Sequence, residues 1–272
     1  MTKLLEIRDL WIEGRSGDDW HKIVKGVNLD LARGEVLGLI GESGAGKSTL
    51  GLTAMGHVRP GCRIAGGSIR FDGQELVGAN AQVLRHLRGR RIAYVAQSSA
   101  AAFNPAWRLI RQHCEAPVRH GVMPRAQAEA EAVRLYTEMR LPDPDQIGFR
   151  FPHQVSGGQL QRAMTAMAMA CKPDLIIFDE PTRGVDVGAI EEIHQLISRL
   201  ADEGKAVVVI SSYLPEVYEL ADTLHVTNAV TELVLAPESW VEHVRVQRES
   251  EQAWHLGFTH AEQATASHYR SF

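Results

Sequence analysis

The chain has 272 residues and a net charge of −4, with 44% apolar and 23% charged residues. This composition excludes a disordered, collagen-like or coiled-coil chain, and no apolar run reaches the roughly 20 residues of a membrane-spanning helix. The mildly acidic balance is no electrostatic footprint for nucleic acid, so we expect no nucleic-acid partner. The scattered Cys62, Cys114 and Cys171 and the charged start of the chain predict a cytoplasmic protein without a signal peptide.

The first third of the chain is patterned as strands. Apolar and polar residues alternate over 27–31, which predicts a half-buried strand. Residues 36–40 are apolar on both faces, which is typical of a central parallel strand. Asp72-Gly73 is a hairpin turn signal after a short strand, and residues 92–95 form another apolar run.

Helical patterning replaces these strands from about residue 105 to 141. Pro124 is well placed to open a helix, and an apolar stripe follows it at Ala128, Ala132, Leu135 and Met139. Strands return at 175–178 and 206–210, with an amphipathic helix over 190–200 between them. Strand, helix and strand in this order predict a parallel crossover and an α/β fold. The segment from about residue 237 is polar and weakly patterned, and we assign it no function.

A glycine-rich stretch fits the phosphate-loop pattern G-x-x-x-x-G-K-[ST] and follows the predicted strand 36–40. Its glycines let backbone N–H groups point at phosphate oxygens, and the next helix adds its positive end. We expect Lys47 to be an exposed, mobile cation for the β- and γ-phosphates, and the Ser48 hydroxyl to bind Mg²⁺. The predicted nucleotide-binding loop comprises Gly41, Glu42, Ser43, Gly44, Ala45, Gly46, Lys47, Ser48 and Thr49.

Two carboxylates end the apolar strand that begins at Leu175. Parallel strands end at one edge of their sheet, so this places Asp179 beside the phosphate loop, where it can hold the Mg²⁺ shell. Glu180 lies one step further along and is suited to polarise an attacking water. A buried strand with a polar exit is the plainer interpretation, but the phosphate loop upstream favours the functional one.

Ser156-Gly157-Gly158-Gln159 lies between the phosphate loop and the Asp179-Glu180 strand and resembles the signature motif of ATP-binding-cassette (ABC) ATPases. The resemblance covers about residues 4–235 and leaves a tail at 236–272. It implies a parallel central sheet, an antiparallel β subdomain and a helical subdomain inserted at about 98–165. The motifs around Gln97 and Asp186 resemble the family's glutamine loop and aspartate loop.

The finer resemblance is to ATPase subunits of bacterial oligopeptide, dipeptide and nickel importers, carried by Gly41–Gly44, Phe103–Pro105 and Phe151–Gln154. It implies hydrolysis of ATP with Mg²⁺, integral membrane permease partners, and a location on the inner face of the membrane. It also implies a second ATPase subunit, identical or different, whose bound ATP faces Ser156 and the Gly157-Gly158 backbone. Gln97 would contact both Mg²⁺ and the region that senses the permease.

The sequence departs from the family pattern at Ser212, which stands at the switch-histidine position. The stretches 183–188 and 211–217 look more like the second cassette of sugar importers, and the tail lacks the extension common in peptide-importer subunits. These departures keep open a nucleotide-gated module with impaired hydrolysis. A soluble ABC protein acting on DNA or ribosomes is disfavoured by the single cassette and the absence of a basic linker. For stacking on adenine we choose Trp20 over Trp11, which we expect to be buried.

Overall fold

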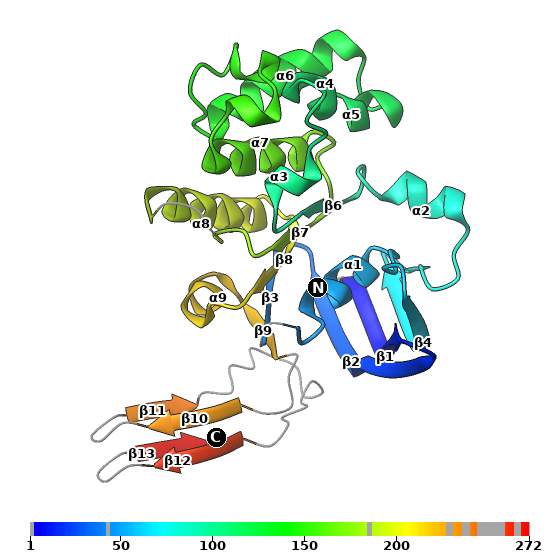
Figure 1. The fold of residues 1–272 in the computed structure, drawn as a ribbon, viewed down its shortest axis with the longest axis vertical. Helices are drawn as coiled ribbons and strands as arrows, with labels where there is room; N and C mark the ends of the chain where they lie inside the picture. Colours follow the sequence, from blue (N-terminus) through cyan, green and yellow to red (C-terminus); the bar gives the residue numbers. More distant parts are fainter. Residues whose placement is uncertain are drawn as a thin grey trace.

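The computed structural model describes residues 3–41, 44–183, 187–226, 231–235, 240–243, 259–263 and 268–271. Figure 1 shows a parallel sheet at the centre, an antiparallel sheet beside it and a helical lobe at one end. Within the described ranges, no helix is both long enough and apolar enough to cross a membrane.

The central sheet has five parallel strands in the order β6-β7-β8-β3-β9. Every residue of β7 and β8 is buried, which explains why their sequences are apolar on both faces. The predicted strands at 36–40, 92–95, 175–178 and 206–210 are all confirmed. Their bounds are β3 (Val36–Ile40), β6 (Ile92–Val95), β7 (Leu175–Asp179), β8 (Ala206–Ser211) and β9 (Thr223–Val226).

Among the helices that pack against this sheet are those that follow β3, β7 and β8 in the chain. The first, α1 (Lys47–Ala54), follows β3 directly after the phosphate loop. The second, α8 (Val187–Asp202), connects β7 to β8, which pair in parallel as the predicted crossover requires. The third, α9 (Leu214–Leu220), lies between β8 and β9. The buried face of α8 carries Ile193, Leu196, Ile197 and Leu200, as its amphipathic pattern predicted.

The second sheet is antiparallel, in the order β2-β1-β4-β5. Asp72 and Gly73 form the predicted turn between its last two strands, and both have positive φ values, 51° and 76°. Such values suit the two-residue turns that match the twist of a hairpin. The bounds are β1 (Lys3–Ser16), β2 (Asp19–Ala32), β4 (Cys62–Phe71) and β5 (Gln74–Glu75).

The helical lobe is built by α3 to α7 and follows β6 in the chain, while α2 (Ala81–Leu87) precedes that strand. The predicted stripe on α6 is confirmed, since Ala128, Ala132, Leu135 and Met139 are all buried in the core of the lobe. Pro124 caps this helix rather than opening it, because the first helical residue is Arg125. The bounds are α3 (Ser99–Ala102), α4 (Leu109–His113), α5 (Glu115–Arg119), α6 (Arg125–Glu138) and α7 (Gly157–Met169), with short 3-10 turns at Ile147–Phe149 and Pro152–Gln154.

The described residues of the C-terminal part form four short strands, in a segment where sequence patterning identified no element. β10 (Thr231–Leu235) pairs in parallel with β12 (Thr259–Gln263), and β11 (Trp240–His243) pairs in parallel with β13 (His268–Ser271). Both pairings have the same offset along the chain, 28 residues, from Thr231 to Thr259 and from Trp240 to His268. The two pairings therefore share one register.

Candidate active site

The site lies at one edge of the central sheet, where neighbouring parallel strands end. The phosphate loop leaves β3 at Gly41, β7 ends at Asp179, and β8 ends one residue before Ser212. β8 lies between β3 and β7, so the carboxyl ends of these three strands lie next to one another at this edge. Ligands of open α/β sheets bind at the carboxyl ends of the strands.

The backbone of the phosphate loop needs two of its glycines. Gly44 and Gly46 both have φ of 89°, a conformation that other residues adopt only with strain. Gly46 also lies against Ile23 of β2, where an added Cβ would come within 2.8 Å of the isoleucine Cγ2 atom. Sequence patterning gave no signal for this Ile23 contact. Glu42 and Ser43, both predicted to bind nucleotide, lie outside the described residues.

Lys47 differs from its prediction as an exposed cation, because only 6% of the residue is accessible. It is the first residue of α1, and its Nζ donates a hydrogen bond of 2.6 Å to the carbonyl of Gly41. The side chain therefore folds back along its own loop. This contact holds the ammonium group at the start of the loop, where a phosphate oxygen could replace the carbonyl as its partner.

Asp179 is buried, with 2% of the residue exposed, and both of its carboxylate oxygens accept hydrogen bonds. Ser48 Oγ donates to Oδ1 at 2.9 Å, and the hydroxyl of Tyr94 in β6 donates to Oδ2. A carboxylate and a hydroxyl side by side are the hard oxygen ligands that Mg²⁺ prefers. The residues present therefore fit the metal that the phosphate loop implies. Tyr94 is part of this site and was not among the predicted residues.

Glu180 follows Asp179 in an unusual backbone conformation, with φ of 51°. Its N–H donates to the carbonyl of Ile210 in β8 at 2.8 Å, which ties the strained residue to the neighbouring strand. Its Oε2 atom accepts a hydrogen bond of 3.0 Å from Ser212 Oγ. Non-glycine residues are held in this region at a cost of about 1–3 kcal/mol, most often at functional sites.

The signature segment lies at the N-terminus of α7. Ser156 caps this helix, accepting a hydrogen bond from the Gln159 N–H at 3.3 Å, and Gln159 Oε1 accepts one from the Ser156 N–H at 3.0 Å. This reciprocal capping box fixes where the helix begins. Ser156 and Gly157 are exposed, Gly158 is half-buried, and a Cβ at Gly157 would meet no atom within 4 Å. The positive end of α7 therefore opens onto solvent.

Other predicted residues are not joined to this group. Gln97 is exposed just after β6, and its side chain makes no hydrogen bond within the described residues. Asp186 lies outside them. Trp20, 37% exposed, stacks on the guanidinium of Arg63 at 4.1 Å. The expectation of a buried Trp11 is wrong, because this residue is half-buried and its indole N–H donates to a surface carboxylate.

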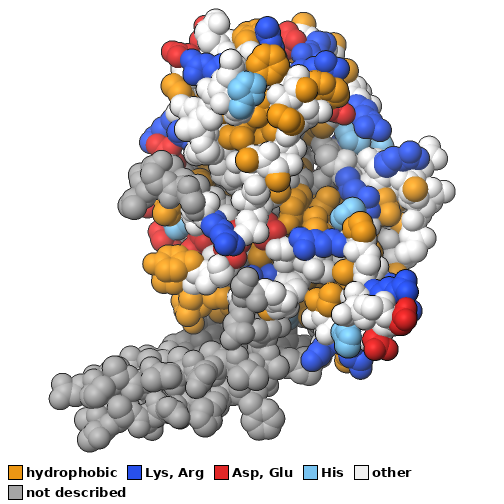
Figure 2. All heavy atoms as spheres, in the orientation of Figure 1, with side chains coloured by type: hydrophobic (Ala, Val, Ile, Leu, Met, Phe, Trp, Pro, Cys, Tyr) orange, Lys and Arg blue, Asp and Glu red, His pale blue; other side chains and the backbone are white. Residues whose placement is uncertain are grey.

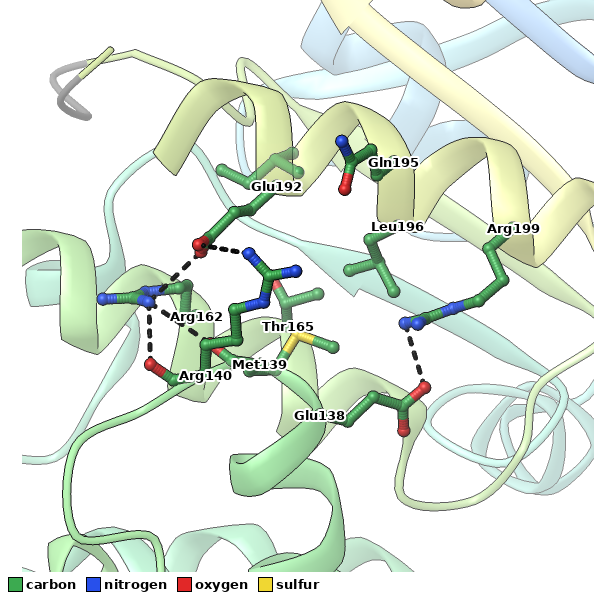
Figure 3. Close-up of a pocket in the computed structure, with 10 residues that line it drawn as sticks. Glu138, Met139, Arg140, Arg162, Thr165, Glu192, Gln195, Leu196 and Arg199 are labelled. Atoms are coloured by element: carbon green, nitrogen blue, oxygen red, sulfur yellow. Dashed lines mark hydrogen bonds and ion pairs between the residues drawn. The ribbon is translucent and has the colours of Figure 1, made fainter. Parts of the chain in front are cut away.

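A small cavity of about 80 Å³ lies away from the site, between α8 and the helical lobe. Figure 3 shows Glu192 of α8 facing two arginines of the lobe. Its carboxylate pairs with Arg140 at 3.1 Å and with Arg162 at 3.3 Å. Arg199 of α8 pairs with Glu138 at 2.9 Å. None of the predicted site residues lines this cavity, which marks an ion-paired contact between the lobe and the sheet core.

A shallow groove of about 470 Å³ lies on the helical lobe itself. Phe149 in this groove is 51% exposed. Arg111 lies 3.9 Å over the ring of Trp107, and Arg108 lies 5.8 Å over the ring of Phe151. Figure 2 shows hydrophobic and basic side chains next to each other on this lobe. The lobe therefore offers an aromatic and cationic surface to solvent.

Comparison with known proteins identifies relatives that match about four fifths of the chain. The family described as "ABC transporter" matches residues 24–183. The oligopeptide transport ATP-binding protein OppD of Lactococcus lactis is 37% identical over 227 residues, which cover 83% of this chain and 67% of that protein. The probable D,D-dipeptide transport ATP-binding protein DdpD of Escherichia coli is 35% identical over 230 residues, which cover 83% of this chain and 70% of that protein.

Solved structures share the fold. The ATP-binding cassette MJ0796, in a dimeric post-hydrolysis state with ADP and Pi, superposes with a TM-score of 0.73 at 23% identity. The superposition covers 82% of this chain and 93% of that one. A second family, described as "SUF system FeS cluster assembly, SufBD core domain", matches residues 193–272. That match begins within α8 and includes all four C-terminal strands.

Proposed function

The chain belongs to the ABC transporter family, and on this premise we propose that it powers a bacterial importer for peptides or a related small solute. Its fold is that of ABC ATPase cassettes, as the motifs predicted. One observation carries the proposal most strongly: Lys47, Ser48, Asp179 and Glu180 lie together at one edge of the sheet. The relatives named for peptide and dipeptide transport support the choice of solute class.

ATP binding starts at the phosphate loop. Lys47 exchanges its contact with the Gly41 carbonyl for the β- and γ-phosphates, and the N-terminus of α1 adds backbone N–H donors. Ser48 and Asp179 are the residues that would hold Mg²⁺, which neutralises phosphate charge when bound. In this proposal a cation, a helix N-terminus and two metal ligands surround one triphosphate.

Hydrolysis needs a base beside the γ-phosphate. Glu180 is the side chain suited to this role, because it follows the metal-binding Asp179 and is held by backbone and side-chain hydrogen bonds. In the proposed reaction its carboxylate orients a water molecule in line with the bond from the γ-phosphorus to the β-phosphate oxygen and accepts the water's proton. As the water oxygen bonds to the γ-phosphorus, that bond breaks, and ADP and phosphate are released. Ser212 supports the Glu180 carboxylate by donating to Oε2.

A second ATPase subunit completes each site in this proposal. The exposed N-terminus of α7, with Ser156, Gly157 and the Gly158 backbone, is an anion site with open space before it. It would face the γ-phosphate held by the partner's phosphate loop. ATP then favours the closed dimer because it contacts both subunits, and hydrolysis removes that differential affinity. The partner can be a second copy of this chain or a related subunit.

The permease would dock on the helical lobe from the cytoplasmic side of the membrane. The groove around Phe149 supports this choice, because aromatic and arginine side chains are typical of binding surfaces. A partner segment with apolar and acidic side chains would complement it. Gln97 is exposed at the start of the lobe, three residues after Tyr94, whose hydroxyl contacts Asp179.

Purification from detergent-solubilised membranes tests the transport role. We expect the tagged chain to retain an integral membrane permease, and Phe149→Asp to retain much less of it while binding ATP normally. The exposed Val122→Asp, a position that does not line the groove, serves as the matched control. Recovery of the chain without any membrane protein, under conditions where ATP binds, would contradict the importer role.

A second candidate function is favoured by the C-terminal strands. Their parallel pairing and the SufBD core match support an ABC ATPase that works in a soluble assembly complex for Fe–S clusters. The same purification distinguishes the two functions, because this candidate predicts co-purifying soluble proteins and no permease. A module that binds ATP with negligible hydrolysis remains the third possibility, since Ser212 occupies the switch-histidine position.

A further inference from the structure

Tyr94 reaches the metal-binding carboxylate from a neighbouring strand. It lies in β6, which pairs with β7 so that Tyr94 is opposite Ile177, two residues before Asp179. Its hydroxyl donates to Asp179 Oδ2, while Ser48 Oγ donates to Oδ1 at 2.9 Å. The two hydroxyls come from different elements, one from a strand of the central sheet and one from α1. Together they satisfy both oxygens of a carboxylate that is 2% exposed.

The ring of Tyr94 is held by apolar neighbours. It packs against the core cluster that contains Leu50 of α1 and Ile177 of β7. The ring is half-buried, and its packing fixes where the hydroxyl points, as is usual for a tyrosine whose hydroxyl has a hydrogen-bond partner. The position of this hydroxyl is therefore set by the packed ring, whereas that of Ser48 is set by the first turn of α1.

The chemistry of this donor suits a cation site. A tyrosine hydroxyl is neutral, so it orients the Asp179 carboxylate without cancelling the negative charge that attracts a metal ion. An arginine or lysine in the same place would compete with the metal. Burial, followed by the hydrogen bond from the hydroxyl to Asp179, raises the pKa of Tyr94 well above its ordinary value.

We propose that Tyr94 is a positioning residue for the Mg²⁺ site, fixing Asp179 from the side opposite Ser48. This inference rests on the proposed ATP-binding function and adds a residue to it. Residues that orient a metal ligand through its second oxygen typically contribute 10- to 100-fold to metal affinity. Tyr94 acts on the metal through Asp179 and on hydrolysis only through the metal.

The test is Tyr94→Phe, which keeps the ring and removes only the hydroxyl. Binding of a fluorescent ATP analogue is titrated with Mg²⁺ and repeated with EDTA in place of the metal. We expect the Mg²⁺ concentration at half-maximal binding to rise at least tenfold, with metal-free nucleotide binding unchanged. Tyr136→Phe is the matched control, since Tyr136 is buried in the helical lobe, away from Asp179. It is expected to leave both titrations unchanged.

Two results for Tyr94→Phe would overturn this inference without counting against the proposed function. One is an unchanged Mg²⁺ titration in Tyr94→Phe. The other is an equal loss of binding with Mg²⁺ and with EDTA, which would indicate a merely structural hydroxyl. Thermal unfolding in EDTA verifies that Tyr94→Phe is folded, and if it is not, Tyr94→Trp is titrated by the same protocol. Failure of the unsubstituted protein to bind the analogue would count against the proposed function itself.

Discussion

Ser212 donates a hydrogen bond of 3.0 Å to Glu180, across the ends of two adjacent parallel strands. Ser212 follows β8 directly, and Glu180 follows β7. The position that the family resemblance assigns to a histidine therefore does contact the candidate base. A serine hydroxyl can donate only one hydrogen bond, and Ser212 donates it to Glu180. This side chain therefore supplies no separate donor to the γ-phosphate.

Replacing Ser212 with histidine tests how much the missing hydrogen-bond donor lowers the rate of ATP hydrolysis. We expect Ser212→His to speed steady-state ATP hydrolysis about 10²- to 10³-fold, the usual effect of one positioned donor at a developing charge. ATP affinity should hardly change, because the phosphate loop makes most contacts with the nucleotide. Ser212→Ala, which also lacks the phosphate donor, is the control and should not be accelerated. Brisk turnover by the unsubstituted chain, unaltered by histidine, would show that Ser212 is no handicap.

Lys47→Ala is expected to weaken ATP binding about 10- to 150-fold, since a hydrogen bond from a charged donor contributes about 1.5–3 kcal/mol. Within the loop the change removes the contact between Nζ and the Gly41 carbonyl, so a small loss of stability accompanies it. Binding of a labelled ATP, with thermal unfolding recorded on the same sample, separates the two effects. A folded variant that binds ATP as tightly as its parent would disprove the role given to the phosphate loop.

The predictable part of this site is the part carried by contiguous motifs. The phosphate loop and the Asp179-Glu180 strand are recognisable in the sequence because backbone geometry and strand direction restrict which residues fit there. Tyr94 and Ile23 were missed, since a tyrosine or isoleucine in a strand carries no signal of what it touches across the sheet. The exposure of Lys47 was wrong for a related reason: a sequence does not show that a flexible side chain folds back onto a carbonyl.

The elements of the fold likewise divide into those that local sequence patterns predict and those that they do not. Strands that are apolar on both faces and the stripe on α6 were confirmed, because burial alone dictates those patterns. The C-terminal strands were not foreseen, since their pairing has an offset of 28 residues, far beyond the range of local periodicity.

Gly157→Ala probes the composite site without disturbing the subunit. A methyl group at this position has open space around it in the single chain, so the free energy of unfolding should be unchanged or slightly higher. In an ATP-closed dimer the same methyl would lie where the partner's γ-phosphate approaches the backbone. We expect Gly157→Ala to weaken the affinity of ATP-dependent dimerisation tenfold or more. Size-exclusion chromatography in the Glu180→Gln background measures this affinity. Undiminished dimerisation would place the N-terminus of α7 away from the interface.

His113 makes the helical lobe sensitive to acid. The residue is 1% exposed, and neither ring nitrogen has a hydrogen-bond partner in the described structure. Burial lowers the pKa of His113 to about 4, although the charge of Glu131 opposes the shift. The neutral ring is therefore favoured by folding, and this stability is complete above the unfolded pKa of about 6.5 and is lost as the pH falls towards 4.

The loss should reach about 3 kcal/mol in the free energy of unfolding near pH 4, because the pKa of His113 is about 4 in the folded protein and about 6.5 in the unfolded chain. Urea unfolding at pH 7.5 and pH 4.5 measures it, with His113→Leu as the comparison, since other groups titrate over the same range. The difference between the two proteins should shrink or reverse at the lower pH. Parallel pH dependences in the two proteins would show that His113 does not titrate in this way.

The central claim is that Glu180 activates water on an ATP molecule held by Lys47, Ser48 and Asp179. Single-turnover phosphate release from bound Mg·ATP, compared between the unsubstituted chain and Glu180→Gln, tests it most directly. The account predicts that Glu180→Gln binds Mg·ATP with unchanged affinity but releases phosphate at least 10²-fold more slowly. Phosphate release at the parental rate from Glu180→Gln would contradict it.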